Sequence, residues 1–216
     1  MRARTLAVVL AATVSVGTML ATHAAGEHPT RAATSTTPRS TPSAPARAPA
    51  WVEAARRQVG VTLHYDPAYV VLAYPGGDVP LARGVCTDVV IRAFRAVGFD
   101  LQREVHEDMR GAFDAYPRLW GLRTPDRNID HRRVPNLQVF FTRRGWALRD
   151  GAALRPGDVV TWMLPGNLPH IGIVSDRSVD GRPLILHNIG AGTVEDDILH
   201  RYRITGRYRP VLPAAR

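Results

Sequence analysis

Apolar residues recur every three or four positions in several segments of the chain, which is the spacing of one face of an α-helix. The clearest case follows Cys86, where the apolar stripe consists of Val89, Val90, Ala93, Phe94 and Val97. Arg92 and Arg95 lie off this stripe and are expected to face outwards, and Gly98 is the expected end of the helix. The same criteria predict helices over residues 50–59, 101–115 and 135–144.

From residue 155 onwards the pattern changes to a period of two with more β-branched residues, which is typical of strands. Strands are predicted over residues 158–163, 171–175 and 184–188, with a last one near 204–209. Residues 176–182 contain the pair Asp180-Gly181, which favours a tight turn and therefore an antiparallel hairpin of the second and third strands. Helices first and strands afterwards predict an α+β fold, with a helix packed against an antiparallel sheet.

Composition divides the chain into three parts. Two arginines precede an uncharged apolar stretch that ends at Leu20, and small residues permit cleavage near Ala24, so residues 1–24 are predicted to be a secretory signal peptide. The stretch is about fifteen residues long, whereas a membrane span needs roughly twenty. Residues 25–50 are rich in Pro, Ser, Thr and Ala and are predicted to be a disordered tether. Residues 51–216 have a length that suits one folded domain.

Export follows from the predicted signal peptide, so the protein is expected to be periplasmic or extracellular. No integral membrane span is expected after signal removal. A retained N-terminal anchor is the alternative, because the same apolar stretch would then remain attached to the domain.

All basic residues of the chain are arginines, and its formal net charge is +9. Within residues 51–216, 23 arginines stand against 18 acidic residues, so about +5 belongs to the predicted domain. A modest positive charge favours an anionic partner such as a cell-envelope polymer. No nucleic acid is expected as a partner, because the chain is predicted to be exported and has no stacking pattern of aromatic and basic residues.

Cys86 is the single cysteine of the chain. An unpaired thiol outside the reducing cytoplasm cannot form an intramolecular disulfide, so it is a candidate reactive group. Its place at the start of a predicted helix predicts a lowered thiol pKa, because the helix dipole and an adjacent imidazolium both favour the thiolate. The alternative is a small buried apolar residue, the usual role of a free cysteine.

Two histidines are placed at one end of the predicted hairpin. His170 opens the second strand and His187 closes the third, so their rings are expected to be neighbours if the strands pair. His170 is then the candidate base for Cys86, and His187 is the candidate polar group that orients it. Asn188 is the alternative orienting residue, because successive strand residues face opposite sides and only one can point at the ring.

Several sequence blocks carry a resemblance to known families. A cysteine followed by LRPGDVV at residues 154–160 and HIGIV at residues 170–174 resembles the papain-like NlpC-type cell-wall peptidases. A closer resemblance, over about residues 52–208, is to an exported bacterial family known only as domain of unknown function 1287. It is carried by the blocks GVCTDVV, HEDM, DRNIDHRRVPNLQVFF, PGDVVTW, LPHIGIVSDR and HNIGAGT.

The resemblance implies a papain-like hydrolase domain and a cysteine peptidase or amidohydrolase that acts on peptidoglycan peptides or another amide substrate. In that scheme Cys86 is the nucleophile, His170 the base and His187 the third residue. Val85 before the cysteine and Thr87 after it depart from the Asp and Ser that the usual NlpC-type enzyme has there. Two alternatives stay open: a non-catalytic cell-wall-binding module on the same fold, and a thiol acyltransferase.

No cofactor and no metal are expected. The cysteine and the histidines are ligand types, and a metal site is the rival chemistry, but their spacing shows no tight pair such as C-x-x-C. The glycines at 190 and 192 follow a strand without opening a helix, so a phosphate-binding loop has little support.

Six polar residues are candidates for binding the substrate. Two lie in a turn-rich loop before Pro67, one lies in the first turn of the cysteine helix, two lie in the polar run 126–133, and one follows His187. Each has an ordinary structural alternative, namely a turn, a carboxylate that complements the helix dipole, or solvated surface. These candidates are Tyr65, Asp66, Asp88, Asp130, His131 and Asn188.

Overall fold

The computed structural model describes residues 48–212 of the chain. The predicted signal peptide (1–24) and nearly all of the predicted tether (25–50) lie outside the described residues, so both stay predictions. Helix α1 begins at the last tether residue, Ala50. Among residues 48–212, no helix combines the length and the apolar character that crossing a membrane requires.

The four predicted helices are present. They are α1 (Ala50–Arg56), α2 (Cys86–Arg95), α3 (Leu101–Ala112) and α4 (Val134–Arg143). The predicted extension of the third helix to residue 115 is a short 3-10 helix, η1 (Phe113–Ala115). A second 3-10 helix, η2 (Asp130–Arg132), was not predicted, because three polar residues carry no helical period.

Five antiparallel strands form the main sheet in the order β6-β5-β4-β3-β7. Their bounds are β3 (Val159–Leu164), β4 (Leu168–Val179), β5 (Arg182–Asn188), β6 (Thr193–Asp196) and β7 (Arg203–Tyr208). The four predicted strands are confirmed, whereas β6 was missed. A separate parallel pair, β1 (His64–Tyr65) and β2 (Arg83–Gly84), was also missed, because two residues show no alternation.

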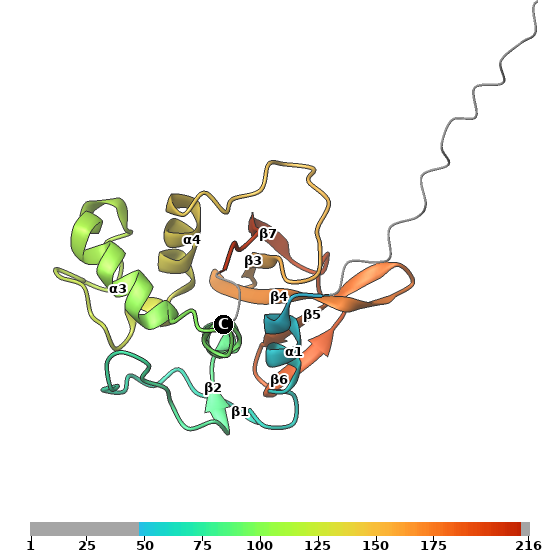
Figure 1. Ribbon diagram of the computed structural model, residues 1–216, viewed down its shortest axis with the longest axis horizontal. Helices are drawn as coiled ribbons and strands as arrows, with labels where there is room; N and C mark the ends of the chain where they lie inside the picture. Colours follow the sequence, from blue (N-terminus) through green and yellow to red (C-terminus); the bar gives the residue numbers. More distant parts are fainter. Residues whose placement is uncertain (1–47, 213–216) are drawn as a thin grey trace, which may run out of the picture. The chain divides into compact units, whose positions relative to one another are not determined.

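The predicted hairpin is formed by β4 and β5, and its turn is tighter than expected. Val179 pairs with Arg182, so the turn consists of Asp180 and Gly181 alone. Both have positive φ, 49° and 75°, as a two-residue turn between twisted strands requires. Residues 176–179 were assigned to the turn because they are mostly polar, but they continue β4 as an exposed ribbon that extends from the sheet (Figure 1).

Both faces of the sheet are buried, and α2 packs against one of them at β4 and β5. On one face, Val89 and Phe94 of α2 pack with Ile171, Ile173 and Leu186 of β4 and β5. Figure 1 shows α1 beside the same two strands. Full burial of a side chain of this size contributes about 2–3 kcal/mol. The predicted α+β class, with the cysteine helix packed on an antiparallel sheet, is therefore confirmed.

The other face of the sheet carries a smaller apolar cluster. Its members are Val160, Trp162, Val174, Ile185, Ile198 and Leu199. The indole Nε1 of Trp162 donates a hydrogen bond to the carbonyl oxygen of Leu199 at 3.0 Å, so the segment after β6 is fixed under β3. Alternate residues of one strand thus face two different cores.

Arg92 was expected to face outwards, and this prediction is wrong. Its guanidinium is buried and donates to Asp78 Oδ2 at 2.9 Å, to Thr62 Oγ1 at 2.9 Å and to the carbonyl oxygen of Arg83 at 2.9 Å. The loop between α1 and α2 covers the polar face of α2. Periodicity could not show this, because the covering residues lie outside the helix.

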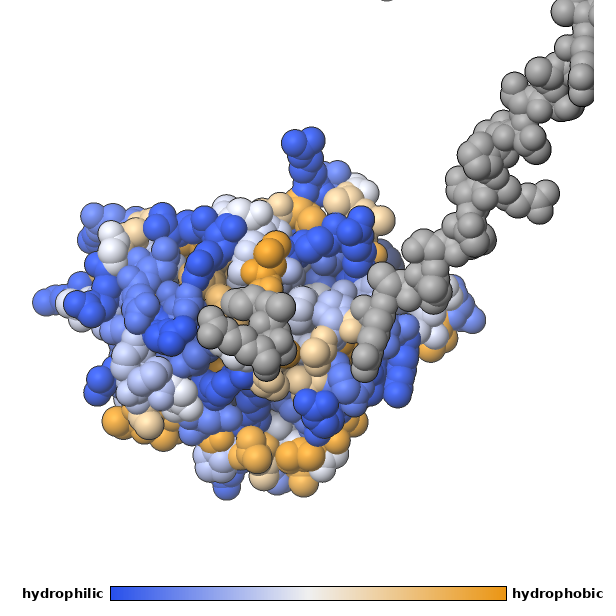
Figure 2. Space-filling model, in the orientation of Figure 1, coloured by the Kyte–Doolittle hydropathy of each residue, from blue (hydrophilic) through white to orange (hydrophobic). Residues whose placement is uncertain are grey.

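Exposed apolar side chains gather in segment 59–81, around β1 and the loops next to it. Figure 2 shows apolar surface at the lower edge of the molecule, where Figure 1 places β1 and β2. Examples are Val61, Leu63, Val71 and Leu81.

Candidate active site

The start of α2 is held in place by its own first turn. The backbone N–H of Val85 donates to Asp88 Oδ2 at 2.7 Å, and the hydroxyl of Thr87 donates to the carbonyl oxygen of Arg132 at 3.1 Å. Val85 has extended backbone, so Cys86 is the first helical residue. The thiol is therefore carried by a position with little conformational freedom.

Asp88 and Arg132 form a buried ion pair beneath this turn. Arg132 Nε lies 3.0 Å from Asp88 Oδ1, and Nη2 lies 3.0 Å from Oδ2. Arg132 also donates to the carbonyl oxygens of Ala68 and Asp66 at 3.2 and 3.3 Å. The pair joins α2, η2 and the loop after β1. Asp88 was predicted as a substrate-binding residue, but the protein's own groups occupy both of its oxygens, which gives it a structural role.

Cys86 is 4% exposed, and its surroundings favour the neutral thiol. Burial raises the pKa of Cys86 to about 12, and the charge of Asp88 adds to this rise. Hydrogen bonds from the backbone N–H groups of Ile171 and Thr87 and from Tyr65 lower the pKa only in part. The predicted lowering of the thiol pKa is therefore wrong, because desolvation outweighs the helix start.

His170 and His187 are in direct contact on neighbouring strands. Nε2 of His170 lies 3.1 Å from Nδ1 of His187, and the two rings are nearly perpendicular, at 88°. Burial, aided by the charge of His187, lowers the pKa of His170 to about 3. Burial also lowers the pKa of His187 to about 4, although Asp196 opposes this shift. Both rings are therefore neutral near pH 7, and Trp162 lies beside the first, with 5.9 Å between ring centroids.

The structure separates the two candidates for orienting His170. His187 faces the His170 ring, whereas the next residue, Asn188, donates from Nδ2 to the carbonyl oxygen of Gly84 at 3.1 Å. Asn188 Oδ1 accepts a hydrogen bond from the N–H of Gly190 at 3.1 Å. Asn188 was also predicted to bind substrate, but it is fully buried and anchors the segment just before the cysteine.

The three predicted catalytic residues come to one end of the sheet from α2, β4 and β5. The Cys86 thiol interacts with the backbone N–H of Ile171, which directly follows His170. Gly172 lets β4 and β5 approach closely, because a Cβ there would lie 2.5 Å from Ile185 Cγ2 and 3.1 Å from His187 Cβ. The pairing of β4 and β5 thus brings the two histidines into contact, and the backbone N–H of Ile171 brings β4 to the start of α2. Among the described residues, no hydrogen bond joins the thiol to either ring.

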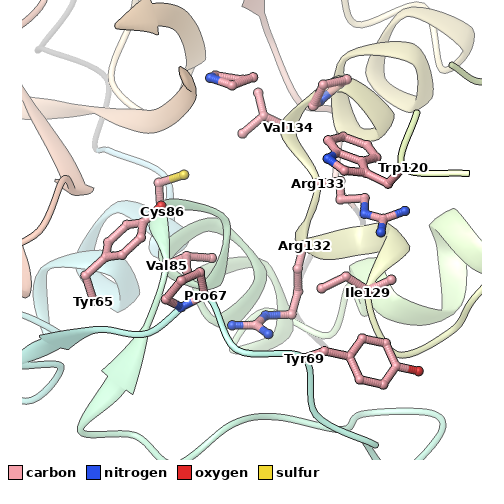
Figure 3. A pocket seen from close by; sticks show the side chains of 12 residues that line it. Tyr65, Pro67, Tyr69, Val85, Cys86, Trp120, Ile129, Arg132, Arg133 and Val134 are labelled. Atoms are coloured by element: carbon pink, nitrogen blue, oxygen red, sulfur yellow. The ribbon is translucent and has the colours of Figure 1, made fainter. Parts of the chain in front are cut away.

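A cavity of about 350 Å³ opens beside the thiol (Figure 3). Figure 3 shows Cys86 and Tyr65 on one side, and Trp120 and Arg133 on the other. Its lining residues are Tyr65, Pro67, Tyr69, Val85, Cys86, Trp120, Ile129, Arg132, Arg133, Val134, Pro135 and Pro169. The volume lies within the range of small-molecule and peptide sites.

Tyr65 is the one predicted substrate-binding residue that lines this cavity. It pairs with Gly84 across β1 and β2, which brings its ring next to the thiol. Burial, followed by the proximity of Cys86, raises the pKa of the Tyr65 hydroxyl to about 12. Asp66 has a turn role instead, because its carboxylate accepts from the N–H of Ala68 at 3.0 Å and from Arg83 at 3.1 Å.

Two members of the polar run 126–133 were predicted to bind the substrate, and the run contributes three lining residues, Ile129, Arg132 and Arg133. The two members chosen from it as substrate-binding residues, Asp130 and His131, are buried and do not line the cavity. Burial raises the pKa of Asp130 to about 6 and lowers the pKa of His131 to about 3. Both belong to the packing of η2.

Trp120 was missed by sequence reasoning. It is an exposed tryptophan with positive φ, 59°, directly before Gly121. A large aromatic side chain in a loop outside every predicted element is the signal that could have identified it.

Within residues 48–212, no group of three or more His, Cys, Asp or Glu side chains is arranged to hold a metal ion. The absence of a metal or cofactor requirement stays a prediction.

These features define an α+β protein with a cysteine at a helix start and a pair of histidines on the adjoining strands. The chain belongs to the family described as domain of unknown function (DUF1287), whose model matches residues 52–210. The predicted membership is therefore confirmed.

A relative in Escherichia coli (strain K12), the uncharacterized protein YijF, is 54% identical over 161 residues, which cover 73% of this chain and 78% of that protein. Among solved structures, NlpC1 from Trichomonas vaginalis is similar with a TM-score of 0.40 and 14% identity. That match covers 74% of this chain and 43% of the other.

Proposed function

We propose that this protein is an exported cysteine peptidase or amidohydrolase of the papain-like type, with cell-wall peptides as substrates. One observation carries the proposal. His170, whose ring lies 3.1 Å from that of His187, directly precedes Ile171, and the backbone N–H of Ile171 contacts the only thiol of the chain. The thiol also lines an open cavity of about 350 Å³. A nucleophile, a base and an orienting group are the parts that acyl transfer needs, and of these the nucleophile lines the substrate-sized space.

The proposed reaction starts from a neutral thiol and a neutral imidazole. Sγ of Cys86 attacks the amide carbonyl carbon as Nδ1 of His170 accepts the thiol proton. Backbone N–H groups at the start of α2 stabilise the oxyanion. His170 then donates that proton to the leaving amine, and a thioester remains on Cys86. Water attacks the thioester with His170 again as base, which releases a carboxylic acid and restores the thiol.

Both groups rest in the neutral form, since burial raises the pKa of Cys86 and lowers the pKa of His170, and both shifts oppose proton transfer between them before substrate binds. In this scheme the thiol proton moves to His170 during the attack, and no thiolate–imidazolium pair forms beforehand. His187 contacts Nε2 of the His170 ring, which leaves Nδ1 of His170 available for the thiol proton.

The test is the release of soluble peptides from purified cross-linked peptidoglycan fragments, measured by mass spectrometry. Wild-type protein is expected to release peptides with new carboxyl termini, and Cys86→Ala and His170→Ala are expected to release none while they keep the wild-type circular dichroism spectrum. His200→Ala, an exposed histidine outside the site, is the matched control and should stay active. Unchanged release by Cys86→Ala would refute the proposal.

A non-catalytic wall-binding module is the second candidate function. The observation that favours it is the burial of the thiol, which is 4% exposed and has its pKa raised to about 12. Sedimentation with purified cell wall separates the two functions. A binding module pellets equally with and without the thiol and releases no peptide, whereas the proposed enzyme releases peptide only with the thiol.

Transfer of the acyl group to an amine instead of water uses the same first step. Product mass distinguishes the two outcomes, because hydrolysis leaves a free carboxylate and transfer leaves a new amide. We propose hydrolysis, and a product that gains the mass of an added amine would show transfer.

Export rests on the two arginines and the apolar stretch of residues 1–24. Fractionation of cells that express the full-length chain tests it. The protein is expected outside the cytoplasm and shortened by about 24 residues. A full-length protein confined to the cytoplasm would overturn this part of the proposal.

A further inference from the structure

The cavity beside Cys86 has an unbalanced charge. Two arginines, Arg132 and Arg133, line it, and no carboxylate does. Arg132 is already neutralised, because Asp88 binds its guanidinium through both oxygens. The charge of Arg133 therefore decides what kind of group the cavity prefers.

Arg133 has no strong partner within the described part of the chain. Its Nη1 is buried and makes no hydrogen bond there, and Asp130 Oδ1 lies 3.8 Å away, which is too far for one. The guanidinium instead lies over the ring of Trp120, at 4.3 Å from the centroid. This contact fixes the orientation of the guanidinium while it leaves its N–H donors unused.

Asp130 is a weak counter-charge for Arg133. Burial raises its pKa to about 6, so the carboxyl is partly protonated in mildly acidic solution. Its Oδ2 accepts a hydrogen bond from the N–H of Asp126, and its Oδ1 makes none with a described residue. An incoming carboxylate would give Arg133 a better partner than its neighbour does.

The other lining residues indicate what the carboxylate is attached to. Tyr65, Trp120 and Val134 present aromatic and apolar surface around the opening to the thiol. A cavity of about 350 Å³ holds a short peptide segment but no bulky polymer. Arg133 and Cys86 line the same cavity, so a bound carboxylate would lie within a few bonds of the amide that is attacked.

We infer that Arg133 is a specificity-determining residue that binds a substrate carboxylate, and that the substrate is an acidic peptide with this carboxylate close to the bond that is cut. The inference deepens the proposed function and rests on it for the bond that is cut. The binding of the carboxylate is separable, because it requires no turnover.

The experiment compares two peptides of the same shape, acetyl-Ala-Glu-amide and acetyl-Ala-Gln-amide. Their dissociation constants are measured by NMR titration of full-length protein carrying Cys86→Ala, which removes any cleavage. The glutamate peptide is expected to bind on the order of tenfold more tightly, as one charge-assisted hydrogen bond provides. The preference should decrease as salt is raised, because the contact is electrostatic.

Three further substitutions in the Cys86→Ala background assign the preference. Arg133→Gln should abolish it. Arg201→Gln should retain it, because Arg201 also lies over an aromatic ring, that of Tyr202, but does not line the cavity. Asp130→Asn should strengthen it, because the competing carboxylate is removed.

Equal dissociation constants for the two peptides, binding of neither peptide, or a preference that survives Arg133→Gln would each overturn the inference. A protein that prefers the glutamate peptide through Arg133 but never cleaves peptidoglycan fragments would refute the proposed function alone. The two failures are thus distinguishable.

Discussion

Nε2 of His170 lies 3.1 Å from Nδ1 of His187, which restricts the proton positions of both rings. If Nδ1 of His170 is to accept the thiol proton, Nε2 must carry the hydrogen and donate it to His187 Nδ1. The remaining hydrogen of His187 then lies on Nε2, which is buried and has no partner among residues 48–212. A buried donor without a partner costs about 1–3 kcal/mol, so this arrangement of protons lowers the stability of the fold.

Substitution of His187 tests this relay. His187→Ala should lower kcat roughly a hundredfold with little change in KM, because it misplaces the base without removing a substrate contact. His187→Asn should retain more activity, since its amide oxygen can accept from His170 Nε2. Steady-state kinetics on a soluble wall peptide gives both values. A change in KM alone would contradict the orienting role.

The reactivity of Cys86 should rise with pH. Because burial raises its pKa to about 12, the thiolate fraction grows about tenfold for each pH unit below that value. In His170→Ala, where no base accepts the thiol proton, alkylation by iodoacetamide, followed by intact-protein mass spectrometry, should therefore be slow at pH 7 and accelerate steadily through pH 10. The urea-unfolded protein is the control and should react much faster at pH 8. A rate in His170→Ala that is constant between pH 5 and 8 would show that the pKa of Cys86 is not raised.

The Asp88–Arg132 pair should be critical for stability. Each partner is 2–3% exposed in its side chain, so Asp88→Asn or Arg132→Met leaves a buried group without its counter-charge and should cost about 3–5 kcal/mol in the free energy of unfolding. The double variant should cost less than the sum of the two single variants. Urea unfolding measures all three.

The matched control for this cycle is the exposed pair of Arg118 and Asp114. Asp114→Asn should have a much smaller effect, because solvent screens exposed charges. Equal losses from the buried and the exposed pair would contradict the role given to Asp88.

Acid should destabilise the fold through buried histidines. The folded-state pKa of His131 and of His170 is lowered to about 3, and that of His187 to about 4, from 6.5. Their contribution to stability is present above pH 6.5 and is lost as pH falls towards the folded values. At pH 5 each such group accounts for on the order of 2 kcal/mol.

Asp130 opposes this trend, because its folded pKa is raised to about 6 and its protonation favours the folded state. A net loss is still expected, since three histidines act against one carboxyl. Urea unfolding at pH 7 and pH 5 measures it, and His131→Leu should reduce the difference. Equal stability at the two pH values would show that these rings are not buried as neutral groups.

Local sequence patterns predicted the helix and the hairpin that carry the three candidate catalytic residues. The stripe after Cys86 located α2, and the pair Asp180-Gly181 located the β4–β5 hairpin, which together bring His170 and His187 to one place. The order of cysteine and histidines in the chain therefore sufficed to name the three candidates. Their chemical roles stay predictions.

Features made by distant contacts could not be predicted. The burial of Arg92 depends on the loop that carries Asp78, and the raised pKa of Cys86 depends on how closely β4 covers the thiol. Trp120 and Arg133 meet across thirteen positions in a region without regular period. Propensity and spacing indicate local secondary structure, whereas the desolvation of a side chain depends on which distant residues cover it.

The most direct test of the central claim is the rate at which a peptidyl vinyl sulfone modifies Cys86, measured by intact-protein mass spectrometry in wild type, His170→Ala and His200→Ala. If the thiol depends on His170 for proton transfer, Cys86 should be labelled fast in wild type and in His200→Ala. The rate in His170→Ala should be lower by at least a hundredfold. Labelling at the same rate without the His170 imidazole would contradict the account.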